Sequence, residues 1–114
     1  MDDCIFCKII NGKIPSNKVY EDDDVLAFKD INPQMPVHII VIPKKHIKSI
    51  ADLTIADEAL IGKVFTAINK IAKDLNISED GFRVISNCGE NAGQTVQHLH
   101  FHILGGEKMS EKII

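Results

Sequence analysis

Three histidines recur at every second position near the C-terminal end of the chain: His98, His100 and His102. Successive side chains of a β-strand point to opposite faces, so an extended backbone here would place all three imidazoles on one surface. The apolar residues between them would then face the core. Imidazole is the side chain best suited to bind a metal, attack as a nucleophile or move protons near neutral pH. The spacing therefore predicts a reactive site.

Two kinds of chemistry fit three imidazoles on one face. They could bind a catalytic zinc ion, with Asp30 or His38 as a further ligand. Alternatively, one imidazole could attack phosphorus and form a phosphoramidate that water opens. The loop before the histidines favours phosphorus chemistry, because its glycines let backbone N–H groups approach an anion and Gln94 and Thr95 add donors. The residues alone leave both alternatives open.

A second group of possible ligands begins with Cys4 and Cys7. Their CxxC spacing lets two thiolates bind one zinc ion, and His46 and His98 are the histidines available to complete a tetrahedral set. A redox pair is the rival interpretation, but redox CxxC motifs follow a strand of a βαβ unit, and no strand precedes this one. A third interpretation is that the two cysteines are small apolar residues that pack within a short helix.

Five segments have the composition of strands that could position these groups. The β-branched segment that contains His38 is typical of a central strand and ends at Pro43. An acidic turn between the first two segments predicts that they form a hairpin. The predicted strands are 18–21, 25–29, 37–42, 82–87 and 98–104.

Two helices complete the expected architecture. Apolar residues recur at i, i+3 and i+4 over 60–75, and Thr54 or Asp57 could cap the start of this long helix. A shorter helix is predicted over 4–10. Strands that are mostly sequence neighbours, with one long helix between the third and fourth, predict an α+β domain spanning 1–114, with an antiparallel sheet and helices on one face. Its final strands could form an edge that pairs with a second subunit.

Composition excludes several functional classes. The 114 residues suit one domain with one core, and a net charge of −3 gives no reason to expect nucleic-acid or membrane binding through bulk electrostatics. No apolar run is long enough to span a bilayer. Three cysteines, an odd number, argue against a disulfide framework and for a reducing cytoplasm. The acidic start, residues 1–4, lacks the basic and apolar regions of a signal peptide.

Residues 98–104 resemble the His-φ-His-φ-His-φ-φ signature of the histidine-triad (HIT) superfamily, and the surrounding sequence is similar to its Hint branch, the purine nucleoside phosphoramidases. The resemblance covers nearly the whole chain. It is carried by blocks at 6–10, 14–15, 27–33, 41–46, 87–89 and 93–96.

The resemblance implies a five-stranded antiparallel sheet with one long and one short helix, and a homodimer whose sheets join. It also implies hydrolysis or transfer at the α-phosphorus of purine nucleoside 5′-phosphoramidates or related nucleotides, with no catalytic metal. Three other functions remain open: a dinucleoside polyphosphate hydrolase, a metal-dependent enzyme, and a nucleotide-binding regulatory module with little turnover.

The resemblance also assigns roles by position. His100 is the nucleophile that forms a nucleotidyl-histidine, and His102 contacts the phosphate and assists proton movement to the leaving group. His98 and His38 support this imidazole network, and Asp30 binds the ribose hydroxyls. The remaining nucleotide-binding positions are Ile31 beside the ribose, Asn87, Gln94 and Thr95 at the phosphate or ribose, and Phe6, Ile9, Phe28 and Ile40 in the base pocket. Several bacterial members hold a structural zinc ion with a set that corresponds to Cys4, Cys7, His46 and His98.

Overall fold

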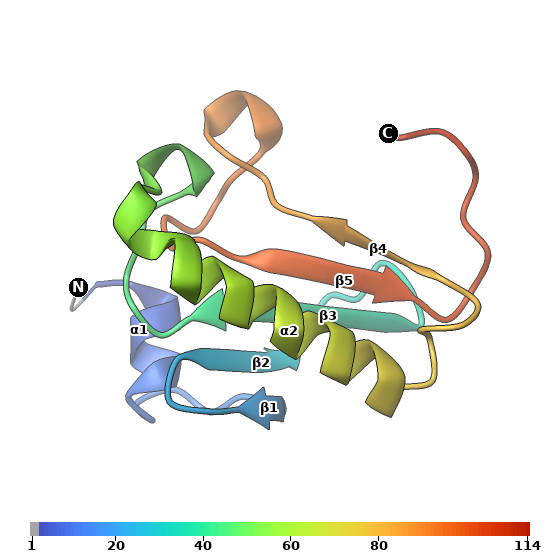
Figure 1. Cartoon of the computed structure of the whole chain (residues 1–114), viewed down its shortest axis with the longest axis horizontal. Helices are drawn as coiled ribbons and strands as arrows, with labels where there is room; N and C mark the ends of the chain where they lie inside the picture. The colour runs from blue at the N-terminus through green and yellow to red at the C-terminus, as the bar shows by residue number, and fades with distance from the viewer. Residues whose placement is uncertain (1–2) are drawn as a thin grey trace.

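Five strands form one antiparallel sheet in the order β1-β2-β3-β5-β4 (Figure 1). The computed structural model describes residues 3–114, so Met1 and Asp2, which belong to the predicted domain and to the acidic start, lie outside the described residues. The fold class predicted from the sequence is confirmed. The strands are β1 (Lys18–Glu21), β2 (Val25–Lys29), β3 (Val37–Pro43), β4 (Phe82–Ile85) and β5 (Phe101–Gly105).

Two α-helices flank the sheet, α1 (Ile5–Ile10) and α2 (Glu58–Asp74). Of the two residues predicted as caps of the long helix, Asp57 is the N-cap of α2, whereas Thr54 caps the short 3-10 turn before it. Thr54 precedes a short 3-10 turn that runs into α2, and its backbone N–H donates to the carboxylate of Asp57, the N-cap of α2, over 3.0 Å. Neither helix, and no other helix within residues 3–114, is long and apolar enough to cross a membrane.

The sheet is covered on both faces, which differs from the expectation that helices occupy one face. Helix α2 packs on the face formed by alternate residues of β2, β3 and β5, such as Val41 and Ile103. Helix α1 packs on the opposite face, where Phe6 and Ile9 join a cluster with Phe28. Strands β2 and β3 are buried along nearly their whole length, so the second face also needs an apolar cover.

The histidine segment enters the sheet later than predicted. Strand β5 begins at Phe101, where pairing with Val41 of β3 starts. Upstream, the N–H of Leu99 donates to the carbonyl of Ile47 over 2.6 Å, because the chain that follows β3 has already left the sheet. Side chains still alternate through this segment, and Leu99 is buried on the α2 face as predicted.

Strand β3 is central and pairs with β2 and β5, as its composition predicted. Strand β4 ends at Ile85, two residues earlier than expected, and pairs with β5 alone among the strands of the described chain. It therefore forms one edge of the sheet, and β1 forms the other (Figure 1).

Candidate active site

The ring of His100 is buried and is held by its own chain. Its Nδ1 lies 2.7 Å from the carbonyl oxygen of His98, and the edge of the ring packs against Phe6 with centroids 5.1 Å apart. A carbonyl oxygen can only accept a hydrogen bond, so Nδ1 of His100 carries the proton and donates. In the neutral ring, Nε2 then has a free lone pair. This is the form in which an imidazole attacks an electrophile.

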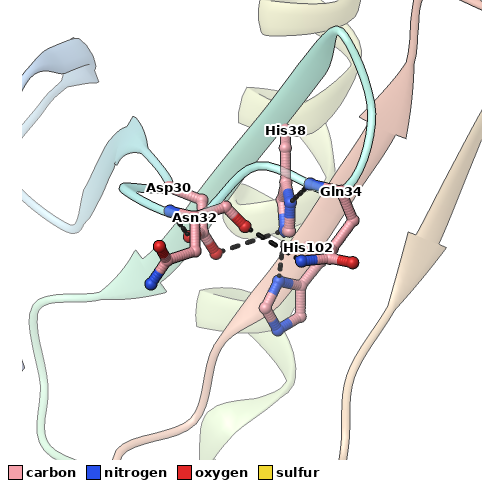
Figure 2. A network of polar contacts seen from close by, with 5 residues as sticks. All are labelled: Asp30, Asn32, Gln34, His38 and His102. Carbon is pink, nitrogen blue, oxygen red and sulfur yellow. Dashed lines mark hydrogen bonds and ion pairs between the residues drawn. The ribbon is translucent and has the colours of Figure 1, made fainter.

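A second group of side chains joins β3, β5 and the loop before β3 (Figure 2). Nε2 of His38 lies 2.8 Å from Nδ1 of His102 and 3.3 Å from Oδ2 of Asp30. On the other side of the His38 ring, the backbone N–H of Gln34 donates to Nδ1 over 3.0 Å. The other carboxylate oxygen of Asp30 accepts from the backbone N–H of Asn32 over 2.7 Å. Asp30, His38 and His102 thus form one connected network.

The histidines at the two ends of the row, His98 and His102, favour the neutral state. Burial is the largest cause that lowers the pKa of His102, and the neighbouring His100 and His38 lower it further, while Asp30 acts in the opposite direction. Burial likewise lowers the pKa of His98. Neutral imidazoles at these positions leave nitrogen lone pairs available for hydrogen bonds or for a metal.

The two N-terminal cysteines meet two histidines on the same side of the sheet. One ligand atom from each of Cys4, Cys7, His46 and His98 lies within 4.8 Å of every other. Nδ1 of His98 is 3.5 Å from Sγ of Cys4 and 3.6 Å from Sγ of Cys7. Nδ1 of His46 is 3.3 Å from Sγ of Cys7.

The chemistry of this set fits a tetrahedral metal such as zinc. Two thiols and two imidazole nitrogens are a common zinc ligand set, and Nε2 of His98 is 2.8 Å from the carbonyl oxygen of Pro43, which fixes Nδ1 as the nitrogen that faces the sulfurs. Burial, followed by the neighbouring Cys4, raises the pKa of the Cys7 thiol to about 11. Two adjacent thiolates are therefore unfavourable here unless a cation balances their charge.

His98 contributes to both sites through different atoms. Its two ring nitrogens face the sulfurs and the carbonyl of Pro43, whereas its backbone carbonyl accepts from His100. The ring of His98 was expected to support the imidazole network, but the group of His98 that contacts His100 is the main chain.

Asp30, His38 and His102 also offer metal-ligand atoms within 4.8 Å of one another. A metal on Nε2 of His38 would leave the ring proton on Nδ1, where it would face the N–H of Gln34, which is itself a donor. This hydrogen bond opposes metal binding at Asp30, His38 and His102, and it is compatible with nucleophilic attack by an imidazole on phosphorus.

The side chain of Gln94 is occupied inside the loop that precedes the histidines. Its Oε1 accepts from the backbone N–H of Gly89 over 2.9 Å, and its Nε2 donates to the carbonyls of Lys48 and Val96 over 2.8 and 3.0 Å. The residue is buried. The side chain of Gln94 therefore has a structural, bracing role: it holds the backbone of the loop in place through these three hydrogen bonds.

Replacing Gln94 by alanine is expected to lower the free energy of unfolding by about 1–3 kcal/mol, because three backbone groups lose their partner. Urea unfolding monitored by circular dichroism measures this change. Gln97→Ala is the matched control: its exposed side chain makes one bond, to the carbonyl of Gln94 over 3.2 Å. Equal losses in the two variants would contradict the bracing role.

The other nucleotide-binding positions divide into exposed and buried sets. Ile31 is 89% exposed beside Asp30, Thr95 is exposed, and Asn87 is half-buried. The four positions expected at the base pocket belong to one buried cluster on the α1 face, completed by Leu26 and Ile42. They are Phe6, Ile9, Phe28 and Ile40.

Three contacts at the site had no signal in the sequence. They are the N–H of Gln34 on His38, the carbonyl of Pro43 at His98, and the hydroxyl of Ser86, which donates to the carbonyl of His100 over 2.8 Å. Each of them uses one main-chain atom, which every residue type supplies. Cys88, the third cysteine, lies apart from the Cys4–Cys7 cluster.

Comparisons of the sequence and of the structure with known proteins agree on one family. A sequence profile of the HIT domain matches residues 11–109. Purine nucleoside phosphoramidase of Escherichia coli is 44% identical over 108 residues, which cover 95% of this chain and 91% of that protein. Among solved structures, a HIT family hydrolase from Clostridium thermocellum has a TM-score of 0.98 at 48% identity, covering 100% of this chain and 99% of that one. A histidine triad protein from Clostridium difficile has a TM-score of 0.95 at 54% identity, covering 98% and 97%.

Proposed function

The chain belongs to the HIT domain family, and from this membership and the geometry of His100 we propose that it cleaves purine nucleoside 5′-phosphoramidates, or related nucleotides, at the α-phosphorus. The observation that carries the proposal is the hydrogen bond from Nδ1 of His100 to the carbonyl of His98. It fixes the tautomer whose Nε2 is a nucleophile. The relative from Escherichia coli, named a purine nucleoside phosphoramidase, supports the substrate class.

The reaction proceeds in two displacements. Nε2 of His100 forms a bond to the α-phosphorus while the bond from phosphorus to the leaving amine breaks, and the electron pair stays on the amine nitrogen, which takes a proton from water. Water then attacks phosphorus, and the phosphorus–His100 bond breaks to release the nucleoside monophosphate. The nucleotidyl imidazole carries a positive charge. The hydrogen bond from Nδ1 of His100 to the carbonyl oxygen of His98 stabilises this charge in both steps.

Turnover tests the proposal directly. Adenosine and guanosine 5′-phosphoramidates, dinucleoside polyphosphates and nucleotidyl sulfates form the panel, and the phosphoramidates are expected to have the highest kcat/KM. A higher kcat/KM for dinucleoside polyphosphates would indicate a dinucleoside polyphosphate hydrolase instead. Tight binding of a nucleoside monophosphate without hydrolysis of any member would instead favour a regulatory binding module.

Asp30 is proposed to bind the ribose hydroxyls, and its substitution should raise KM more than it lowers kcat. Hydrogen bonds donated to a charged acceptor contribute about 1.5–3 kcal/mol, so Asp30→Ala is expected to raise KM roughly 10- to 100-fold. Steady-state kinetics with a ribose substrate and its 2′,3′-dideoxy analogue separate the effect from general damage. The substitution should raise KM for the analogue by much less. An equal rise with both substrates would contradict the ribose contact.

We also propose that Cys4, Cys7, His46 and His98 hold a structural zinc ion. Bound zinc would fix α1 against the sheet and take no part in the phosphorus chemistry. Reduced thiols are needed for this, which agrees with the cytoplasmic location predicted from the cysteine count.

A homodimer is proposed because β4 is an edge strand of the described sheet, where a second copy could continue the sheet. Sedimentation equilibrium of the full chain measures the oligomeric state, and a monomer at micromolar concentration would contradict the proposal.

A further inference from the structure

The backbone N–H of Gln34 begins a hydrogen-bonded chain that ends at His102 (Figure 2). This N–H donates to Nδ1 of His38 over 3.0 Å, and Nε2 of His38 lies 2.8 Å from Nδ1 of His102. An amide N–H can only donate, whereas a neutral imidazole has one donor nitrogen and one acceptor nitrogen. The first member therefore sets the direction of every later bond.

The tautomers of both rings follow from this direction. Because Nδ1 of His38 accepts, the proton of that ring is on Nε2, and its nearer acceptor is Nδ1 of His102 at 2.8 Å, with Oδ2 of Asp30 at 3.3 Å. Nδ1 of His102 is then an acceptor, and its proton is on Nε2. The chain ends in a single N–H group at Nε2 of His102.

The same chain opposes a second proton on His102. That proton would be on Nδ1 and would face the N–H of His38 across 2.8 Å. The groups around the ring agree: burial lowers the pKa of His102, His100 and His38 lower it further, and Asp30 alone raises it. His102 is thus held neutral.

The loop that carries Gln34 is constrained on both sides of it. Pro33 and Pro36 fix their own φ angles and restrict the residues before them. The start of the loop is fixed by Asp30, whose backbone N–H donates to the carbonyl of His38 over 3.0 Å and whose carboxylate accepts from Asn32. The N–H of Gln34 therefore meets the ring in a prearranged position.

We propose that the amide of Gln34 is a positioning group that makes His102 a neutral N–H donor to the phosphoryl oxygens, and not the acid that protonates the leaving amine. This rests on the proposed function. It keeps the phosphate contact expected of His102 and removes its part in proton transfer. The leaving nitrogen takes its proton from water, and the hydroxide equivalent opens the bond between phosphorus and His100, so one water is consumed overall. A neutral imidazole can stabilise developing charge while retaining its proton.

Nuclear magnetic resonance tests the tautomers without any need for turnover. Long-range ¹H–¹⁵N correlation spectra of the full chain with labelled histidine rings, at slightly alkaline pH, assign each ring by single substitution. We expect a proton on Nε2 and none on Nδ1 for both His38 and His102, without and with adenosine monophosphate. A proton on Nδ1 of either ring, or a doubly protonated His102 in the complex, would overturn the proposal even if the enzyme proves active.

The dependence on the leaving group tests the role of His102. His102→Ala should lower kcat by a similar factor, about 10²-fold, for phosphoramidates of strongly and weakly basic amines, because a donor to the phosphoryl oxygens acts on a group common to all of them. If His102 were the acid, the loss would grow with the basicity of the leaving amine. A growing loss would refute the donor role.

A pair of substitutions isolates the amide itself. Gln34→Ala keeps the N–H and removes the side chain, whereas Gln34→Pro removes both. Gln34→Ala should retain both tautomers and keep kcat within about threefold. Gln34→Pro should give His38 a mixture of tautomers and lower kcat about tenfold relative to Gln34→Ala, with a smaller change in KM. Unchanged tautomers in a folded Gln34→Pro protein would contradict the proposal. If this variant does not fold, the wild-type spectra and the His102→Ala series decide.

Discussion

Replacing His100 by asparagine is expected to lower kcat on an adenosine 5′-phosphoramidate by about a thousandfold or more, because the variant has no atom that can attack phosphorus. Asparagine is the informative choice. Its side-chain amide can still donate to the carbonyl of His98, which is the bond that Nδ1 of His100 makes. The hydroxyl of Ser86 also keeps its partner, the main-chain carbonyl of residue 100.

The fold should survive this substitution. The ring of His100 packs edge-on against Phe6, so a smaller side chain costs some buried contact, of the order of 1 kcal/mol. Thermal unfolding is therefore measured beside kinetics, and rapid alkaline quenching, which preserves a phosphorus–imidazole bond, followed by mass spectrometry detects a nucleotidyl group on the wild-type chain alone. Turnover within tenfold of the wild type would disprove the assignment of His100 as nucleophile.

Metal removal should produce the second large effect, on stability and not on turnover. Elemental analysis of the untagged protein is expected to find about one zinc ion per chain. A ligand present at 1,000 times its Kd stabilises the folded state by about 4 kcal/mol, so chelation should lower Tm by roughly 10 °C or more. Activity at 25 °C should stay within about threefold, because the carbonyl of His98 still orients His100 without the metal.

The cysteines offer a matched pair of variants. Cys7→Ser should lose the metal and unfold at the temperature of the chelated wild type. Cys88→Ser, outside the cluster, should keep both metal and Tm. Loss of turnover on chelation would indicate a catalytic metal instead, and a protein with neither zinc nor a change in Tm would mean that the four side chains only pack together.

Much of the fold could be predicted from the sequence, because its strands are short and their apolar and polar residues are strongly patterned. The bounds of β1 and β2 agree with the prediction, and alternation alone placed Leu99 on the core face and His100 on the other. The face of the sheet on which α1 packs could not be predicted from the sequence. The apolar residues of α1 predict a helix, but only the burial of β2 on both faces shows that a cover is needed opposite α2.

Residue types identified the groups that could react, and they could not show how those groups are connected. The spacing of the histidines suggested one row of equivalent imidazoles. In the structure, however, the two ring nitrogens of His98 face the cysteine sulfurs and the carbonyl of Pro43. The direction of the hydrogen bond at His38 depends on the backbone amide of a loop residue, Gln34. Main-chain contacts depend on the path of the backbone, and side-chain chemistry does not encode that path.

The cluster of Cys4, Cys7, His46 and His98 has a consequence for the unfolded chain. Cys4 and His98 are 94 residues apart, so an ion bound to both closes most of the chain into a loop. In chain-entropy terms, a covalent cross-link around a loop of this length raises the free energy of the unfolded state by about 4–5 kcal/mol, because the linked chain has fewer conformations. Disulfides do not persist in reducing compartments. A bound metal would give this protein a reversible substitute, one that links its first helix to the segment before its last strand only while the ion is available.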